Sequence, residues 1–190
     1  MRITGGQARG IPLKAPPGNQ VRPAMDAMRE AIFSSLGLRI NEAKVLDLFA
    51  GSGAYGLEAL SRGAASCCFV EKDRRTLSFL ESNASAVAKS IGEKMNYQSV
   101  RMDAMKWQAG SQKYDIIFID PPYPLLNEHG LAMLKQAAPL LTTSENSRLI
   151  LEAPGGWEPT GNIEEIQPSL NLLKRLGKGR NQPSALVFSL

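Results

Sequence analysis

The chain has 190 residues, of which 43% are hydrophobic and 21% charged, values typical of one folded domain that completes its core without disulfides or metals. It shows no secretory leader and no stretch long enough to span a bilayer, and its two cysteines, Cys67 and Cys68, are adjacent, which disfavours a disulfide. These features exclude a disulfide-rich secreted protein and a transmembrane protein, and we expect a cytoplasmic protein without membrane contact.

The net charge of +4 is unevenly distributed along the chain. Residues 1–39 and residues 170–190 each carry a net charge of +4, whereas residues 40–169 carry −4. Basic ends around a mildly acidic middle favour a polyanionic partner, and ordinary solubilising charge is the alternative.

In chain order, residues 1–20 are rich in glycine and proline and predict a small hairpin or extended arm, followed by a main domain over 21–190. A helix is predicted over 23–38, because Ala27, Ala31, Ile32, Ser35 and Leu36 recur at helical spacing. Apolar runs then predict strands over 45–49, 67–70, 116–119 and 149–151, and residues 97–102 are expected to form a further strand. These strands alternate with predicted helices over 54–62, 74–91 and 131–141.

The segments 170–173 and 185–190 predict two final antiparallel strands joined by a basic loop. Together the elements predict an α/β, Rossmann-like fold with a mostly parallel seven-stranded sheet and helices on both faces.

A glycine-containing turn follows the strand over 45–49, where open α/β sheets bind ligands. Gly51 and Gly53 would let the backbone approach a ligand closely. Glu71 ends the next strand, 20 residues after Gly51, and could accept hydrogen bonds from both hydroxyls of a ribose. These residues predict a cofactor that carries an adenosine.

The three glycines 51, 53 and 56 also match the dinucleotide pattern G-x-G-x-x-G, so an NAD-dependent oxidoreductase is an alternative, as is a turn without a ligand. Asp47 disfavours NAD, because its carboxylate would stand beside a pyrophosphate of like charge. It is better placed to hold the cationic amino-acid part of S-adenosylmethionine, directly or through water.

A second turn, Asp120-Pro121-Pro122-Tyr123, directly follows the strand over 116–119. The prolines fix the backbone and leave carbonyl oxygens as acceptors, to which Asp120 adds a carboxylate. Tyr123 supplies a ring on which a base can stack. Such a turn suits a planar exocyclic amino group. A Pro-Pro turn alone would not show that this segment has a function, because such turns are frequent. Here the turn follows an apolar strand in a chain that also has the glycine turn, and this favours a functional site.

These residues resemble a known family. The second turn is similar to that of amino-group methyltransferases of nucleic acids and glutamine. The chain is identified as a member of the RsmD family by further stretches that extend over nearly its whole length and weaken after about residue 154: residues 1–3, 9–10, 22–23 with Asp26, 29–31 with Phe33, 47–53, 56–64, 71–73 and Asn83.

The resemblance implies an enzyme that transfers a methyl group from S-adenosylmethionine to N2 of a guanine in 16S rRNA, within the assembling 30S subunit. It further implies a cytoplasmic monomer without a metal. The catalytic residues would be Asp120, Pro121, Pro122 and Tyr123. The cofactor-binding residues would be Arg22, Asp47, Phe49, Ala50, Gly51, Ser52, Gly53, Glu71, Lys72, Asp103, Ala104 and Asp120. The RNA-binding residues would be Arg2, Arg9, Lys14, Arg29, Lys174, Lys178 and Arg180.

Some of these assignments have alternatives. Asp103 could contact the adenine amino group or cap a helix. Arg22 and Arg29 could pair with the cofactor carboxylate or with RNA phosphates, and Arg29 could equally be a solvated helix residue.

Four other functions remain to be weighed. A DNA adenine-N6 methyltransferase shares the second turn, but such enzymes usually carry a target-recognition segment for which this chain has little room. A non-catalytic RNA-binding assembly factor would not need the intact turn. A cysteine-dependent pyrimidine methyltransferase is disfavoured because Cys67 and Cys68 lie in a predicted strand. Zinc chemistry is disfavoured because His129 is the only histidine.

Overall fold

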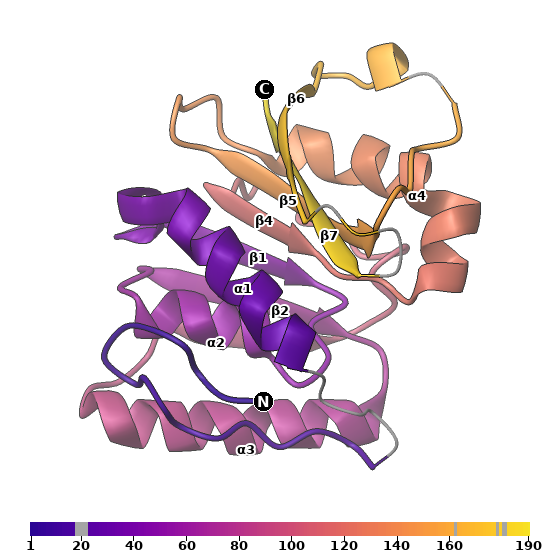
Figure 1. Ribbon diagram of the computed structural model, residues 1–190. Helices are drawn as coiled ribbons and strands as arrows, with labels where there is room; N and C mark the ends of the chain where they lie inside the picture. Colours follow the sequence, from indigo (N-terminus) through magenta and orange to yellow (C-terminus); the bar gives the residue numbers. More distant parts are fainter. Residues whose placement is uncertain (18–22, 162, 178, 180–181) are drawn as a thin grey trace.

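The computed structural model describes residues 1–17, 23–161, 163–177, 179 and 182–190, and its core is one seven-stranded sheet (Figure 1). The strand order is β3-β2-β1-β4-β5-β7-β6. Neighbouring strands from β3 to β5 are parallel, and β7 runs antiparallel to both β5 and β6. The strands are β1 (Lys44–Leu48), β2 (Ser66–Glu71), β3 (Tyr97–Arg101), β4 (Ile116–Ile119), β5 (Arg148–Pro154), β6 (Asn171–Leu176) and β7 (Pro183–Ser189).

Helices cover both faces of the sheet, with α1 to α3 on one face and α4 on the other (Figure 1). The strands β1, β2, β4 and β5 are buried on both faces, so their alternate residues belong to two apolar clusters. Val45 and Phe118 pack under α1 to α3, while Leu46 and Ile117 pack under α4. The helices are α1 (Pro23–Leu36), α2 (Ala54–Ser61), α3 (Arg74–Ile91) and α4 (Tyr123–Ala137), with short 3₁₀ turns η1 (Gly37–Ile40), η2 (Ala138–Leu140) and η3 (Ile163–Glu165).

The predicted fold class and all seven strands are confirmed, but two details of the helices were wrong. The helix expected over 131–141 is α4, which begins at Tyr123, because Pro122 and Pro124 fit the N-terminal turn of a helix. In α1 the buried residues include Met28, Ile32, Phe33 and Leu36, while Ala27 and Ala31 are exposed. The larger side chains remove more apolar surface from water, and this decides which face packs on the sheet.

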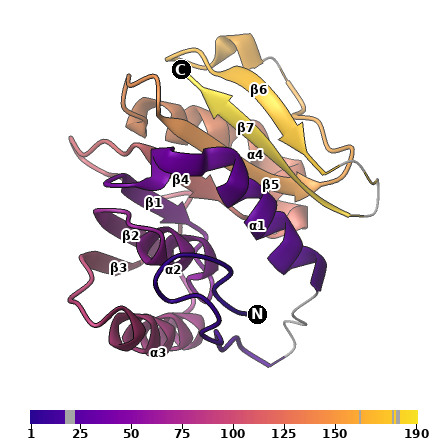
Figure 2. The same ribbon diagram turned by 60° about the vertical axis from the view of Figure 1, so that its left-hand side comes forward.

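The N-terminal residues form the expected hairpin, which lies against α2 and α3 (Figure 2). Its two sides are joined by hydrogen bonds from the Ile3 amide to the Ile11 carbonyl (2.9 Å) and from the Gly10 amide to the Ile3 carbonyl (2.9 Å). Ile3, Ala8 and Leu13 are buried in the cluster beneath α1 to α3. Residues 1–17 therefore share the core of the main domain; residues 18–20 of the predicted arm lie outside the described residues.

A buried carboxylate fastens this hairpin to α1 and α2. Glu58 of α2 is fully buried and accepts hydrogen bonds from the Thr4 amide (2.7 Å), Arg62 Nε (2.8 Å) and Arg29 Nε (3.4 Å). A buried charge is tolerated only when it is paired and hydrogen-bonded, as Glu58 is. The network therefore joins the N-terminal hairpin, α1 and α2 to one another.

Candidate active site

The site lies at the carboxyl ends of β1 and β4, neighbouring strands from which the chain continues to opposite sides of the sheet. Ligands of open α/β sheets bind in the crevice at such a switch point. A cavity of about 730 Å³ opens there, within the range of about 300–1,000 Å³ for small-molecule sites. Its lining includes the predicted residues Phe49, Gly51, Glu71, Lys72, Ala104, Asp120, Pro121, Pro122 and Tyr123.

The glycine turn between β1 and α2 is shaped by left-handed backbone at Phe49 (φ 61°), Gly51 (φ 55°) and Gly53 (φ 84°). At Gly53 a side chain would also crowd the core, because an added Cβ would stand 3.0 Å from Leu80 Cγ. Phe49 adopts this backbone without being glycine, at a cost of roughly 1–2 kcal/mol. Its side chain lines the cavity, so the strained residue is one that a bound molecule would touch.

Glu71 ties the glycine turn to the end of β2. Its Oε2 accepts the Gly51 amide (2.9 Å), and its Oε1 accepts the Asp73 amide (2.8 Å). Each carboxylate oxygen has two lone pairs, so both can still accept a hydroxyl from a molecule in the cavity that Glu71 lines. The arrangement suits the adjacent hydroxyls of a ribose.

Asp47 is placed differently from the prediction. It is 1% exposed, lies behind the lining, and its Oδ2 accepts the Gly56 amide in the first turn of α2 (2.9 Å). A direct contact with a cofactor is therefore not expected. The pKa of Asp47 is raised to about 8, chiefly by burial; the Gly56 hydrogen bond opposes this rise and the nearby charge of Glu71 adds to it.

The second turn joins β4 to α4 directly, and all four of its residues line the cavity. Asp120 is partly buried, and Pro121 is buried. Pro122 caps α4, and its carbonyl accepts the Leu126 amide (3.0 Å), so this oxygen belongs to the helix and is not free for a substrate. Tyr123 is the first residue of α4 and is 40% exposed at the cavity. Asp120 and the Pro121 carbonyl remain as the candidate acceptors.

Sequence reasoning missed Glu152, which lines the same cavity from β5. It is 5% exposed and accepts a hydrogen bond from the Tyr55 hydroxyl of α2. The Tyr55 ring stacks on Phe118, with 5.1 Å between ring centroids. The signal was the one that identified Glu71 and Asp120, namely an acidic residue at the carboxyl end of an apolar parallel strand.

The carboxyl groups make the cavity favourable for a cation. Burial raises the pKa of Asp120 well above its usual value, and the charges of Glu152 and Asp47 raise it further. Burial also raises the pKa of Glu152, against the Tyr55 hydrogen bond and the charge of Arg29, which lower it. A positive charge inside the cavity would favour the ionised carboxylates and be stabilised by them.

Besides Asp47, four predicted cofactor residues are not part of the cavity lining: Ala50, Ser52, Gly53 and Asp103. Asp103 Oδ1 accepts the Met105 amide (3.0 Å), so it acts as a cap for the turn after β3. The Ser52 carbonyl accepts Asn83 Nδ2 (2.9 Å), and the same amide nitrogen donates to the Lys14 carbonyl (2.9 Å). Asn83 thus links the glycine turn to the N-terminal hairpin. Arg22 lies outside the described residues.

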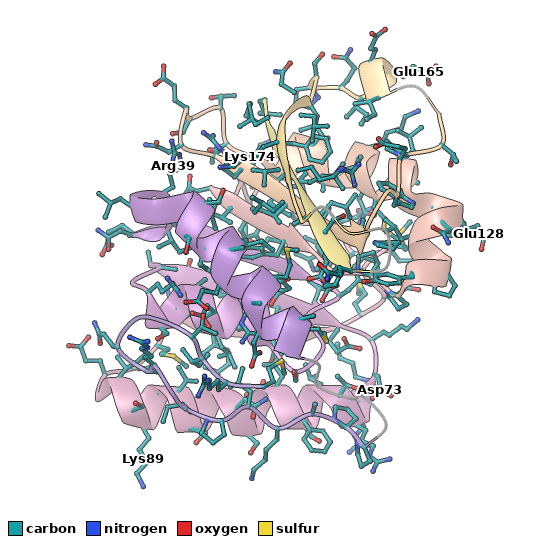
Figure 3. The ribbon with its side chains drawn as sticks, viewed as in Figure 1. Arg39, Asp73, Lys89, Glu128, Glu165 and Lys174 are labelled. Carbon is teal, nitrogen blue, oxygen red and sulfur yellow. The ribbon has the colours of Figure 1, made fainter. Side chains whose placement is uncertain are left out.

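Among the candidate RNA contacts, Arg2, Arg9, Lys14 and Lys174 are exposed. Figure 3 shows Lys174 on β6 well away from Asp73, which marks the cavity end of β2. The prediction that Arg29 binds RNA is corrected by the structure. Arg29 is 2% exposed and pairs with Asp26 (2.8 Å) and Glu58 (3.4 Å). Because both its partners are within the fold, it is not available to RNA phosphates. Lys178 and Arg180 lie outside the described residues.

The described part of the chain has neither a membrane-spanning helix nor a metal-binding cluster. None of its helices is long and apolar enough to cross a membrane. None of its groups of histidine, cysteine, aspartate and glutamate side chains could hold a metal ion. Cys67 and Cys68 are buried in β2 and reduced, in keeping with a place in the core.

Comparisons with known proteins agree on one family. The family model described as Conserved hypothetical protein 95 matches residues 1–175. The chain is 34% identical over 190 residues to Ribosomal RNA small subunit methyltransferase D of Escherichia coli (strain K12), covering 95% of this chain and 93% of that protein. The Haemophilus influenzae protein of the same name is 32% identical over 135 residues, which is 70% of each chain.

Solved structures give the same result. The Escherichia coli protein yhhF has a TM-score of 0.78 and is 32% identical, covering 99% of this chain and 96% of that one. A conserved hypothetical protein from Streptococcus pyogenes has a TM-score of 0.67 and is 28% identical, covering 84% of this chain and 93% of that one.

Proposed function

Because this chain belongs to the RsmD family, whose model carries the description Conserved hypothetical protein 95, we propose that its cavity is the active site of a guanine-N2 methyltransferase of small-subunit rRNA. The chain is an S-adenosylmethionine-dependent rRNA methyltransferase. The observation that carries the assignment of the site is a single cavity lined by both turns, one suited to an adenosine and one to an exocyclic amine.

The residues of the cavity fit the cofactor. Glu71 offers acceptors for ribose hydroxyls, and Phe49, Val70 and Ala104 give an apolar lining for the adenine ring. The carboxyl groups of Asp120 and Glu152, with Asp47 behind them, favour a cation, and the cofactor is a sulfonium. When bound, S-adenosylmethionine supplies an electron-poor methyl carbon. We propose Glu71, Phe49, Gly51, Lys72 and Ala104 as its binding residues, whereas Asp47 acts only by accepting the Gly56 amide behind the glycine turn.

Asp120 and the Pro121 carbonyl are the proposed acceptors for the two hydrogens of the guanine amino group. They would fix the amine in the plane that lets its nitrogen attack, and the Asp120 carboxylate would stabilise the positive charge that develops there. Asp120 is also placed to take the proton that N2 loses once the new N–C bond has formed. Tyr123, exposed beside the cavity, would stack on the base after it leaves its neighbours in the RNA.

The proposed substrate is 16S rRNA in the assembling 30S subunit, methylated in the cytoplasm by a monomer without a metal. The name of the Escherichia coli relative supports the small subunit as the target. The exposed Arg2, Arg9, Lys14 and Lys174 are the proposed phosphate contacts. A DNA adenine methyltransferase is less well supported, because the described residues form one domain with its N-terminal hairpin and offer no separate segment for reading DNA.

The test compares the wild type with Asp120→Ala on small subunits from cells that lack this gene. We expect the wild type to transfer tritiated methyl groups and to yield N2-methylguanine by nucleoside mass spectrometry. Asp120→Ala should lose turnover yet still bind S-adenosylmethionine in calorimetry, whereas Glu145→Gln, in an exposed loop, should match the wild type. Normal turnover by Asp120→Ala would refute the role of Asp120. Absence of N2-methylguanine with the wild type would refute the proposed function.

A further inference from the structure

Glu152 and Asp120 stand side by side at the edge of the sheet. The parallel strands β4 and β5 are paired in a register that ends with Ile119 opposite Leu151, so the next residues of the two strands are Asp120 and Glu152. Residues paired in this way project to the same side of a sheet from strands about 4.8 Å apart. Both residues line the cavity, so two carboxyl groups face the position proposed for the target base.

The Glu152 side chain is held in one orientation. The Tyr55 hydroxyl donates to its Oε2, and the Tyr55 ring is buried against Phe118. No described residue donates a hydrogen bond to the other carboxyl oxygen, Oε1, which is left for a molecule in the cavity. Glu152 is thus a carboxyl group that is 5% exposed, oriented by a buried hydroxyl and part of the cavity lining. It is placed to accept a hydrogen bond from a molecule in the cavity.

We propose that Glu152 selects guanine as the base to be methylated, by accepting the hydrogen of guanine N1 while Asp120 accepts from the neighbouring N2 amine. This inference rests on the proposed function and adds to it a residue that reads the base. Glu152 does not contact the methyl group, and its role is separate from that of Asp120.

The chemistry of the bases explains why this pair would discriminate. On guanine, the exocyclic amine stands next to N1–H, so the edge presents adjacent donors that match adjacent carboxylates. On adenine, the exocyclic amine stands next to a bare N1 acceptor, which would face the Glu152 oxygen without a hydrogen between them. A buried acceptor left without a donor strongly disfavours the wrong base.

The experiment compares two RNAs that differ at one base. The nucleotide that the wild-type enzyme methylates is identified first. Small-subunit rRNA is then ligated around a synthetic segment that carries either guanosine or 2-aminopurine riboside at that nucleotide. 2-Aminopurine keeps the N2 amine but has a bare acceptor at N1. We expect the wild type to prefer guanosine by roughly 10- to 100-fold in kcat/KM, the value of a hydrogen bond to a buried charge.

Two variants separate recognition from folding. Tyr55→Phe/Glu152→Met replaces both partners by apolar groups of similar size, which leaves no hydroxyl unsatisfied. It should reduce the preference to less than about threefold, mainly by losing activity on guanosine. Tyr55→Phe alone keeps the carboxylate and should retain most of the preference. Glu145→Gln should behave as the wild type.

The outcomes are distinct. Equal rates on the two RNAs with the wild type, or an undiminished preference in the double variant, would overturn the role of Glu152 and leave the proposed function standing. No methylation of the guanosine RNA by the wild type would instead remove the proposed function, and this inference with it.

Discussion

The buried carboxyl group of Asp47 should make the protein less stable as the pH rises, and Asp47→Asn should remove this effect. Asp47 has a pKa of about 8 in the folded chain and an ordinary value of 3.8 when exposed. Between these values the folded chain holds a proton that the unfolded chain has released. The free energy of unfolding therefore falls by about 1.4 kcal/mol for each pH unit in this window.

The size of the effect follows from this slope. Near pH 4 the variant and the wild type should have the same free energy of unfolding, because both carry a neutral group at this position. At pH 7 the variant should be more stable by at most about 4 kcal/mol, since water that enters on ionisation lowers the cost of a buried charge. Asparagine is isosteric and can still accept the Gly56 amide, so the packing is preserved.

Urea unfolding, followed by the fluorescence of Trp157 and the buried Trp107, measures the difference. With a slope of about 2–3 kcal/mol per molar urea, the gap between the two midpoints should widen by about 1 M from pH 5 to pH 7. Glu145→Gln, which changes an exposed carboxylate, is the control and should show a constant gap. A gap for Asp47→Asn that does not change with pH would refute the reasoning.

Three further predictions concern the cofactor, the core and the RNA. Glu71→Gln removes a charged acceptor from the turn and from the ribose, so the affinity for S-adenosylmethionine should fall roughly 10- to 100-fold in calorimetry, and an unchanged affinity would contradict its role. Gly56→Ala would place a Cβ 2.2 Å from Phe69 Cε1, so the free energy of unfolding should drop by about 1–3 kcal/mol in urea titrations; no drop would show that α2 can move away. The three exposed cations of the hairpin are Arg2, Arg9 and Lys14. Replacing them by alanine should lower the slope of log affinity for 16S rRNA against log salt, measured by filter binding, by about 1 for each phosphate that is no longer bound. An unaltered slope would exclude these residues from the RNA interface.

Most of the sheet was predictable because β1, β2, β4 and β5 are buried on both faces and therefore appear as short apolar runs between glycines and helices. The start of α4 was not, because Pro122 and Pro124 interrupt the periodicity, and only the structure shows that they occupy its first turn. The buried face of α1 was also missed, since Ala27 and Met28 are both apolar and spacing alone does not rank them by the surface they bury.

The same limits apply to the site. Glu71 and Asp120 were found because an acidic residue at the end of an apolar strand is visible in the sequence. Glu152 satisfies the same rule, but it stands just before Gly155 and Gly156, where the regular alternation of strands and helices ends, so no partner motif marks it in the sequence. Arg29 could not be judged from the sequence, because its partner Glu58 is 29 residues away and the two meet only once α1 and α2 pack together.

The position of Met1 decides how the protein should be handled in the laboratory. Met1 is among the residues that line the cavity, and its carbonyl accepts the Leu13 amide (3.0 Å), so it is held at the cavity rim. The other end of the chain, Leu190, lies well away from the N-terminus (Figures 1 and 2). A purification tag placed before Met1 would begin at the mouth of the cavity and obstruct it. A tag after Leu190 leaves the entrance open, so methyl-transfer measurements should use that version.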